Sequence, residues 1–219
     1  MQIQMLDKKL NNYIETLIER YPILNSVEED IIEAYCILED CFLNGNKLLI
    51  AGNGGSAADS EHIVGELMKG FKKKRAIDKE FTEALINVDY DMGIKIASSL
   101  QKGLPAISIC NHYALNTAFL NDVDGELCFA QQVNGYGNKG DVLLAISTSG
   151  NSRNILYSAV VAKAKEMKVI GLTGENGGEL SNIANVTVKV PEKETFMVQE
   201  LQLPVYHCWC LMLEEMFFV

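Results

Sequence analysis

Two pairs of side chains in this sequence have the types and spacing needed to move protons. His62 and Glu66 are four residues apart, so both side chains lie on one face of a helix. A histidine beside a carboxylate can bind a metal or share a proton, although a solvated ion pair is the simpler interpretation of these two residues alone. Gln199 precedes His207 by two helical turns, within or beside the apolar stretch 201–212. A histidine in such a stretch is by itself more often a hydrogen-bonded core residue than a ligand.

Two polar loops could hold a phosphate group. The turn Gly52–Ser56 lies between an apolar run and a helical pattern, where free backbone N–H groups and the positive end of a helix dipole bind anions. The loop 147–152 (Ser-Thr-Ser-Gly-Asn-Ser) carries four hydroxyl groups that can donate hydrogen bonds to a dianion. Turn-forming glycines and helix N-caps are the simpler explanation of each loop alone. Their shared position favours a phosphate, because ligands of open α/β sheets bind at the carboxyl ends of strands.

Neither loop has a nucleotide-binding fingerprint. Ala57 occupies the third glycine position of G-x-G-x-x-G, and no Gly-Lys-Ser or Gly-Lys-Thr follows either loop. A nucleotide-binding oxidoreductase would also need an acidic residue near the end of a second strand, where this chain has the basic run 72–75. That class of protein is therefore the weakest of the alternatives.

Short apolar runs alternate with helical patterns along the chain and predict how these residues are positioned. Buried strands are predicted at 47–51, 105–109, 141–146, 169–172 and 186–190. Helices are predicted at 3–20, from a Ser26/Glu29 capping box to about 44, after each polar loop, around 92–100, and at 194–218 with an interruption at Pro204. The alternation predicts an α/β protein in which helices cover both faces of a central parallel sheet.

Composition limits the class of protein. The chain has 219 residues, 48% of them apolar, and a formal net charge of −10, which predicts one domain that repels nucleic acid and anionic lipid. It has no secretory leader pattern and no long uncharged apolar stretch, and the spacing of its six cysteines is not that of a disulfide framework. We therefore expect a cytoplasmic protein without a membrane span or a nucleic-acid partner.

The first 45 residues are predicted to form a helical hairpin ahead of a core at 46–219. The apolar faces of the two predicted helices are larger than is needed to cover one sheet. This suggests that the helices are shared between subunits. We expect a single domain across 1–219 whose N-terminal helices take part in oligomerisation.

Several motifs together resemble one known family. The sequence segments 51–56 (AGNGGS), 145–152 (AISTSGNS) and 172–174 (LTG), with the His62/Glu66 and Gln199/His207 pairs, are similar to phosphoheptose isomerases of the sugar isomerase (SIS) domain family. The resemblance covers nearly the whole chain. It implies a flavodoxin-like three-layer fold, a homotetramer with active sites between subunits, and conversion of sedoheptulose 7-phosphate to D-glycero-D-manno-heptose 7-phosphate.

The resemblance also assigns expected roles to individual residues. One Zn²⁺ per subunit is implied, and the positions that bind it or transfer protons match His62, Glu66, Gln199 and His207. Expected substrate contacts come from Asn53, Gly54, Gly55, Ser56, Asn111, Ser147, Thr148, Ser149, Ser152 and Gln199.

Aldose–ketose isomerisation, an intramolecular oxidation and reduction, fits this residue set. The reaction passes through an enediol, which needs a base to move a proton between C1 and C2 and an acid to move protons between the oxygens. We expect Glu66 to be the base and His207 the acid. A metal on the same side chains would polarise the carbonyl.

Three departures from the family leave other functions open. His112 follows Asn111 where the family has Asp, Gly70 stands beside Lys69 where it has Arg, and Phe196 replaces an acidic residue. The segment 72–104 is also longer than is usual for the family. We hypothesise that Lys69 or the basic run 72–75 replaces the missing arginine near the phosphate. The alternatives are an isomerase of another ketose phosphate and a non-catalytic SIS protein that binds sugar phosphates.

Overall fold

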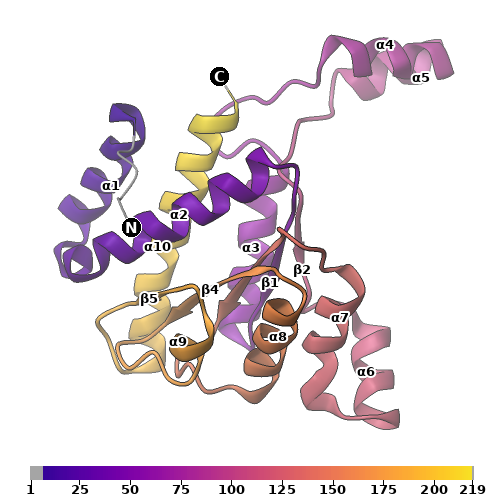
Figure 1. The fold of residues 1–219 in the computed structure, drawn as a ribbon. Helices are drawn as coiled ribbons and strands as arrows, with labels where there is room; N and C mark the ends of the chain where they lie inside the picture. Colours follow the sequence, from indigo (N-terminus) through magenta and orange to yellow (C-terminus); the bar gives the residue numbers. More distant parts are fainter. Residues whose placement is uncertain (1–6, 219) are drawn as a thin grey trace.

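The computed structural model describes residues 7–218 and forms one α/β unit (Figure 1). The strands are β1 (Leu48–Ala51), β2 (Ala106–Ser108), β3 (Val142–Ile146), β4 (Lys168–Thr173) and β5 (Val186–Lys189). The α-helices are α1 (Lys8–Arg20), α2 (Glu28–Leu43), α3 (Gly55–Met68), α4 (Lys79–Val88), α5 (Tyr90–Ala97), α6 (Tyr113–Asp122), α7 (Cys128–Tyr136), α8 (Arg153–Ala164), α9 (Leu180–Ile183) and α10 (Thr195–Phe217). The short 3₁₀ helices are η1 (Pro22–Val27) and η2 (Gly125–Leu127).

The five predicted strands are confirmed, and they pair in parallel in the order β2-β1-β3-β4-β5. This is the strand order of flavodoxin, in which the direction of the strand order switches between β1 and β3. Leu48 of β1 pairs with Val142 of β3, so the two strands end at the same level. The polar loops that follow them therefore begin side by side.

Helices cover both faces of the sheet, as the alternating pattern predicts. In β1, Leu48 and Ile50 face the core formed with α2, α3 and α10, whereas Leu49 and Ala51 face the core formed with α7 and α8. All four residues of the strand are fully buried. A strand with no exposed residue is continuously apolar, which explains why these runs could be found in the sequence.

The N-terminal helices pack against the long C-terminal helix α10. The apolar stripe of α1 is buried there, and the Trp209 indole N–H donates to the Ile31 carbonyl of α2 at 3.0 Å. The predicted capping box is wrong, because η1 continues into α2 and the Ser26 hydroxyl donates to the Ile23 carbonyl instead. The start of the predicted first helix, at 3–6, lies outside the described residues. Use of these helices in oligomerisation stays a prediction.

The interruption predicted at Pro204 is also wrong, since α10 runs without a break from Thr195 to Phe217. Pro204 is buried inside the helix. A proline there removes one backbone hydrogen bond, a loss that the packing of the surrounding helix tolerates. Gln199, His207 and Glu214 therefore lie on one continuous helix.

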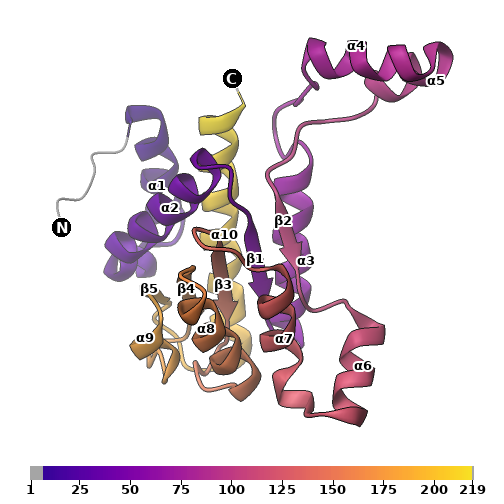
Figure 2. The same ribbon diagram turned by 45° about the vertical axis from the view of Figure 1, so that its right-hand side comes forward.

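The long segment after α3 forms an arm of two helices that stands away from the body (Figure 2). The predicted helix around 92–100 corresponds to α5, but α4 was not predicted. Within the described residues, α4 and α5 pack on each other and make no comparable contact with another element. Large apolar side chains are exposed on the arm at Phe81, Val88, Tyr90, Met92 and Ile94.

Among the helices formed by residues 7–218, none combines the length and the apolar character that crossing a bilayer requires.

Candidate active site

The two polar loops meet at the carboxyl ends of β1 and β3. Asn53 of the first loop and Asn154, just after the second, exchange two hydrogen bonds of 2.9 Å between their side-chain amides. This contact spans the switch point of the sheet, where ligands of flavodoxin-like folds bind. Sequence reasoning missed Asn154, because its partner Asn53 is 101 residues away in the chain.

The first loop is a tight turn that begins α3. Gly54 has a φ of 56°, a left-handed conformation that favours glycine. A Cβ on Gly52 would lie 2.4 Å from the backbone oxygen of Ser56, so the turn closes on itself. Ser56 is buried and donates its backbone N–H to the Asn53 carbonyl at 3.0 Å. The N-terminal N–H groups of α3 point toward this exposed turn.

The second loop is partly held by its own hydroxyl groups. Ser147 is buried, lies 3.2 Å from the Ser152 hydroxyl and accepts the Gly150 N–H. Ser149 is exposed and accepts the Asn151 N–H at 3.1 Å. The Thr148 carbonyl accepts the Gly174 N–H at 2.9 Å. The bond between Ser147 and Ser152 uses one of their two hydroxyl hydrogens, whereas the Ser149 hydroxyl accepts and so keeps its hydrogen to donate to an anion.

The end of β2 adjoins the first loop. The Cys110 thiol donates to the Gly52 carbonyl at 3.3 Å, and Asn111 and His112 follow with exposed side chains. These two residues border a shallow hollow with Gln132 and Tyr113. Asn111 is thus placed beside the predicted phosphate loops.

The predicted acid–base residues lie together between α3 and α10. His62 Nε2 is 3.3 Å from Glu66 Oε1, and the rings of His62 and His207 meet edge to face with centroids 5.0 Å apart. The Phe71 ring packs on His207 from the other side, with centroids 5.4 Å apart. His62 and Glu66 therefore form the i,i+4 pair that the sequence left open, with side chains 42% and 14% exposed, and the His207 ring lies against His62.

Burial disfavours the protonated form of His207. Its burial lowers the pKa of the imidazole, the nearby His62 lowers that pKa further, and Glu66 opposes both effects. His207 also borders an apolar groove of about 230 Å³ between α1 and α10, which Tyr13 and Leu203 help to line. A lowered pKa makes the protonated imidazole a stronger proton donor.

Tyr206 and Asp59 complete the site and were missed by sequence reasoning. The Tyr206 hydroxyl donates to Asp59 Oδ1 at 3.0 Å and lies 3.2 Å from His62 Nδ1. Burial raises the pKa of Tyr206, as does the Asp59 carboxylate, so the phenol stays protonated. Burial raises the pKa of Asp59 as well. Asp59 is three residues before His62 on α3, a spacing that the sequence did show.

Gln199 lies at a different level of the two helices. Its side-chain amide packs on Gly55, where an added Cβ would be 2.5 Å from Nε2. Glu66 follows Gly55 by eleven residues of one helix, which is about 16 Å at about 1.5 Å per residue. In one chain, the phosphate loops and Gln199 are therefore at one end of α3, and Glu66 is at the other.

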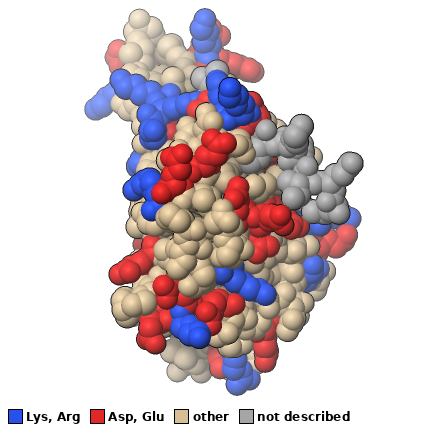
Figure 3. Space-filling model, turned by 90° about the vertical axis from the view of Figure 1, so that its left-hand side faces the viewer, with Lys and Arg blue, Asp and Glu red and all other residues tan. Residues whose placement is uncertain are grey.

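The structure contradicts part of the hypothesis on the basic run. The Arg75 side chain is 0% exposed and ion-paired with Glu214, so it cannot reach a sugar phosphate. Lys73 Nζ lies 2.8 Å from Glu215, and Lys69 Nζ lies 3.5 Å from Glu66 Oε2. Several Lys and Arg side chains lie toward the arm at the top of Figure 3, whereas the rest of this face is mostly uncharged, with Asp, Glu and further basic side chains scattered over it.

Two buried polar atoms of the site, Glu66 Oε2 and His207 Nε2, have no hydrogen-bond partner among residues 7–218, although Lys69 Nζ lies 3.5 Å from the first. Buried atoms of this kind are rare and often mark a missing ion or water. Within residues 7–218, no three His, Cys, Asp or Glu side chains are arranged as a ready metal site. The two unpaired atoms and the nearby His62 nitrogen have the chemistry of zinc ligands, but they are not assembled around a common point.

Comparison with known proteins identifies close relatives. A family model described as SIS domain matches residues 92–174. The chain is 36% identical over 187 residues to the phosphoheptose isomerase of Nitratiruptor sp., covering 85% of this chain and 86% of that protein. It is 31% identical over 209 residues to the phosphoheptose isomerase of Shewanella sp. strain ANA-3, covering 94% and 93%.

Solved structures show the same fold. A phosphoheptose isomerase from Francisella tularensis superposes with a TM-score of 0.73 at 32% identity, covering 94% of this chain and 97% of that one. The phosphoheptose isomerase GmhA from Neisseria gonorrhoeae gives a TM-score of 0.72 at 27% identity, covering 96% and 100%. The Vibrio vulnificus NanR protein, solved with ManNAc-6P, shares only the fold, with a TM-score of 0.56 at 12% identity.

Proposed function

From its membership of the phosphoheptose isomerase family of SIS-domain proteins, which the comparisons establish for this chain, we propose how its residues carry out the reaction. The chain is a sugar-phosphate isomerase acting on sedoheptulose 7-phosphate. We assign Glu66 as its base and His207 as its acid. The observation that carries the assignment is the cluster between α3 and α10, in which His62 contacts both residues.

In this proposal, Glu66 removes a proton from C1 of the ketose while His207 protonates the oxygen on C2, giving the enediol. Glu66 then returns its proton to C2, and His207 takes the proton of the O1 hydroxyl, so that an aldehyde forms at C1. Glu66 and His207 each end in the protonation state in which they began. The burial of Glu66, with a side chain 14% exposed, supports this role because it keeps water away from the carboxylate.

The phosphate is proposed to bind at the switch point of the sheet. Backbone N–H groups at the start of α3, in the turn of Asn53, Gly54, Gly55 and Ser56, are the proposed main-chain donors. Hydroxyl donors come from Ser147, Thr148, Ser149 and Ser152, and sugar contacts from Asn111 and Gln199.

We further propose that a complete site forms between two copies of the chain. An extended seven-carbon sugar phosphate does not bridge the separation, along α3, between the loops and Glu66 of one chain. A second copy that presents its Glu66 and His207 to these loops would remove the gap. The homotetramer implied by the sequence resemblance supplies such an interface, and the exposed apolar arm offers surface for association.

A zinc ion is proposed to be held by His62, Glu66 and His207 of one chain and by Gln199 of the second copy, because Gln199 of the same chain lies at the other end of α3. Because Tyr206 donates its proton to Asp59, its oxygen is left to accept from His62 Nδ1, and this tautomer leaves His62 Nε2 free to bind a metal. When bound, the ion would polarise the substrate carbonyl as a Lewis acid. His207 Nε2, which has no hydrogen-bond partner among the described residues, and Glu66 Oε2, which lies 3.5 Å from Lys69 Nζ, support the assignment.

A cytoplasmic location is also proposed. The six cysteines are free thiols, four of them buried, which suits a reducing compartment.

The proposal is tested by following sedoheptulose 7-phosphate with the purified protein by ³¹P and ¹H NMR, beside other ketose phosphates as a panel. We expect a heptose 7-phosphate as the product. If only another ketose phosphate is turned over, the differences from the family at His112 and Phe196 would reflect specificity for that sugar. Binding without turnover of any member would instead support a sugar-phosphate sensor.

The shared site is tested by co-expressing two inactive variants, Glu66→Gln and Ser147→Ala/Ser149→Ala. If the site combines residues from two chains, mixed oligomers contain some intact sites and recover activity. If each chain holds its own site, the mixture stays as inactive as its parents.

A further inference from the structure

Arg75 is one of three buried charged residues in the part of the chain that the structure describes, and no part of the proposed reaction uses it. Its Nε donates to Glu214 Oε1 at 2.9 Å, and the side chains of the two residues are 0% and 3% exposed. An ion pair at this depth is costly to desolvate, and apolar residues of similar size would often serve stability equally well. Its other contacts show what the pair holds in place.

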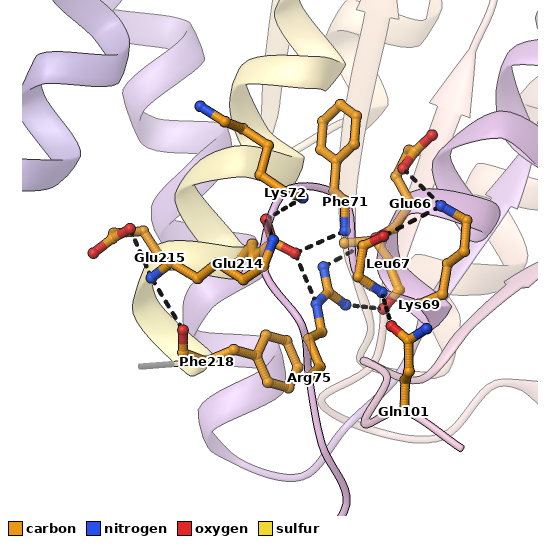
Figure 4. A network of polar contacts seen from close by, with 12 residues as sticks. Glu66, Leu67, Lys69, Phe71, Lys72, Arg75, Gln101, Glu214, Glu215 and Phe218 are labelled. Atoms are coloured by element: carbon orange, nitrogen blue, oxygen red, sulfur yellow. Dashed lines mark hydrogen bonds and ion pairs between the residues drawn. The ribbon is translucent and has the colours of Figure 1, made fainter. Parts of the chain in front are cut away.

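The guanidinium group closes the C-terminal end of α3. Its Nη1 donates to the Leu67 carbonyl at 2.7 Å and its Nη2 to the Glu66 carbonyl at 3.1 Å (Figure 4). The last carbonyls of a helix have no partner within the helix, and a cation there is favoured by the helix dipole. Arg75 therefore fixes the backbone of the residue that carries the proposed base.

The Glu214 carboxylate holds the turn after α3. It accepts the backbone N–H groups of Phe71 and Lys72 at 2.8 Å, and that of Lys73 at 3.2 Å. The ring of Phe71 lies against His207, two helical turns before Glu214 on α10. The pair thus contacts the Glu66 backbone directly and reaches the proposed acid through Phe71.

We propose that Arg75, paired with Glu214, is a positioning residue that sets the distance between Glu66 on α3 and His207 on α10. This inference rests on the proposed function of those two residues. Arg75 does not touch the substrate. A shift of about 1 Å at a reacting group can lower the rate about 100-fold, so a residue of this kind is expected to affect turnover more than binding.

The test compares Arg75→Lys with Asp141→Asn. Lysine keeps the charge but cannot donate to Glu214 and to two carbonyls at once. Asp141 is a matched control, because it is also buried, pairs with Lys47 and accepts two backbone N–H groups, but those partners are Lys47 and Asn138 at the starts of β1 and β3 and not residues of α3 or α10. A double variant, Arg75→Met/Glu214→Gln, avoids an unpaired buried carboxylate if Arg75→Lys fails to fold.

We expect kcat of the Arg75 variants to fall about 10- to 100-fold with KM within about twofold of wild type, and kcat of Asp141→Asn to stay unchanged. A folded Arg75 variant with wild-type kcat would overturn the proposal. A parallel measurement needs no substrate: the ring ¹⁵N signals of His62 and His207 should shift in the Arg75 variants and not in Asp141→Asn. Unshifted signals would also overturn it. Shifted signals in a protein that isomerises no ketose phosphate would support the positioning role while the proposed function fails.

Discussion

His62 is held by neighbours that decide which of its nitrogens is available. The hydrogen-bond chain runs from His62 Nδ1 to the Tyr206 hydroxyl and on to Asp59, and it leaves Nε2 directed at Glu66. Such outer partners fix the tautomer and the ring orientation of a ligating histidine. At the residue scale, the site therefore depends on Tyr206 as well as on the residues that carry the chemistry.

Replacing Tyr206 with phenylalanine should break this chain with little loss of packing. We expect zinc affinity and turnover to fall about 10-fold or more, since the hydrogen bond that orients His62 is lost. Retained zinc can be measured by elemental analysis after dialysis, and turnover by the NMR assay. The control is Tyr157→Phe, which removes an exposed hydroxyl bonded to Arg153 and should change neither quantity. Equal zinc retention and turnover in Tyr206→Phe and wild type would contradict the role of Tyr206.

At the element scale, local sequence patterns predicted the strands and most of the helices that cover the sheet, but not the features that depend on contacts between distant segments. The strands were found because residues such as Leu48 and Leu49 are buried on both faces of the sheet, which makes each run continuously apolar. Helix α4 was missed because it has no buried residue. The strand order, the continuity of α10 through Pro204 and the position of Gln199 on Gly55 depend on packing between distant segments, and local patterns do not encode such packing.

For the candidate site, the sequence identified the members but not their grouping. His62, Glu66 and His207 come together as expected, yet Gln199 is held at the other end of α3. Arg75 resembled a solvated charge in a basic run and proved to be buried. Its partner Glu214 is more than a hundred residues away, so nothing in the local sequence marked the pair.

Gly52 is the position at which the first loop tolerates no side chain. Alanine there would place its Cβ 2.4 Å from the Ser56 backbone oxygen, so the turn must open and its N–H groups must move. We expect phosphate affinity to fall about 10-fold or more and stability to fall by about 1–3 kcal/mol. Titration with inorganic phosphate and urea unfolding measure the two effects.

Gly65→Ala, in the helix that follows this loop, provides the comparison. A Cβ on Gly65 meets nothing within 4 Å, and alanine in a helix interior is favoured over glycine by about 0.5–1 kcal/mol. We expect this variant to be at least as stable as wild type with unchanged phosphate affinity. Equal behaviour of the two glycine variants would contradict the account of the first loop.

At the scale of the whole molecule, Glu214 joins α10, the end of α3 and the root of the arm. Burial alone would raise the pKa of Glu214, but the N–H groups of Lys72 and Phe71 and the Arg75 guanidinium outweigh it and lower the pKa below its ordinary value. A carboxylate with a lowered pKa stabilises the fold fully above its unfolded pKa of about 4.3, and this stabilisation is lost as pH falls through the folded value.

The stability difference between wild type and Glu214→Gln should therefore depend on pH. We expect it to be largest at neutral pH and to shrink progressively below about pH 4.3. Urea unfolding at a series of pH values measures the difference. Glu80→Gln, on the exposed arm, should differ from wild type by less than about 0.5 kcal/mol throughout. A difference for Glu214→Gln that is constant across this range would show that its charge is not what the network stabilises.

The central claim, that Glu66 moves the proton between C1 and C2, is tested most directly by exchange with solvent. The protein is incubated with sedoheptulose 7-phosphate in D₂O, and deuterium at C1 of the ketose and C2 of the aldose is followed by NMR. The account predicts incorporation by wild type and none by Glu66→Gln, with the ³¹P signal of the substrate still perturbed by binding to the variant. Incorporation by Glu66→Gln at the wild-type rate would show that another group is the base.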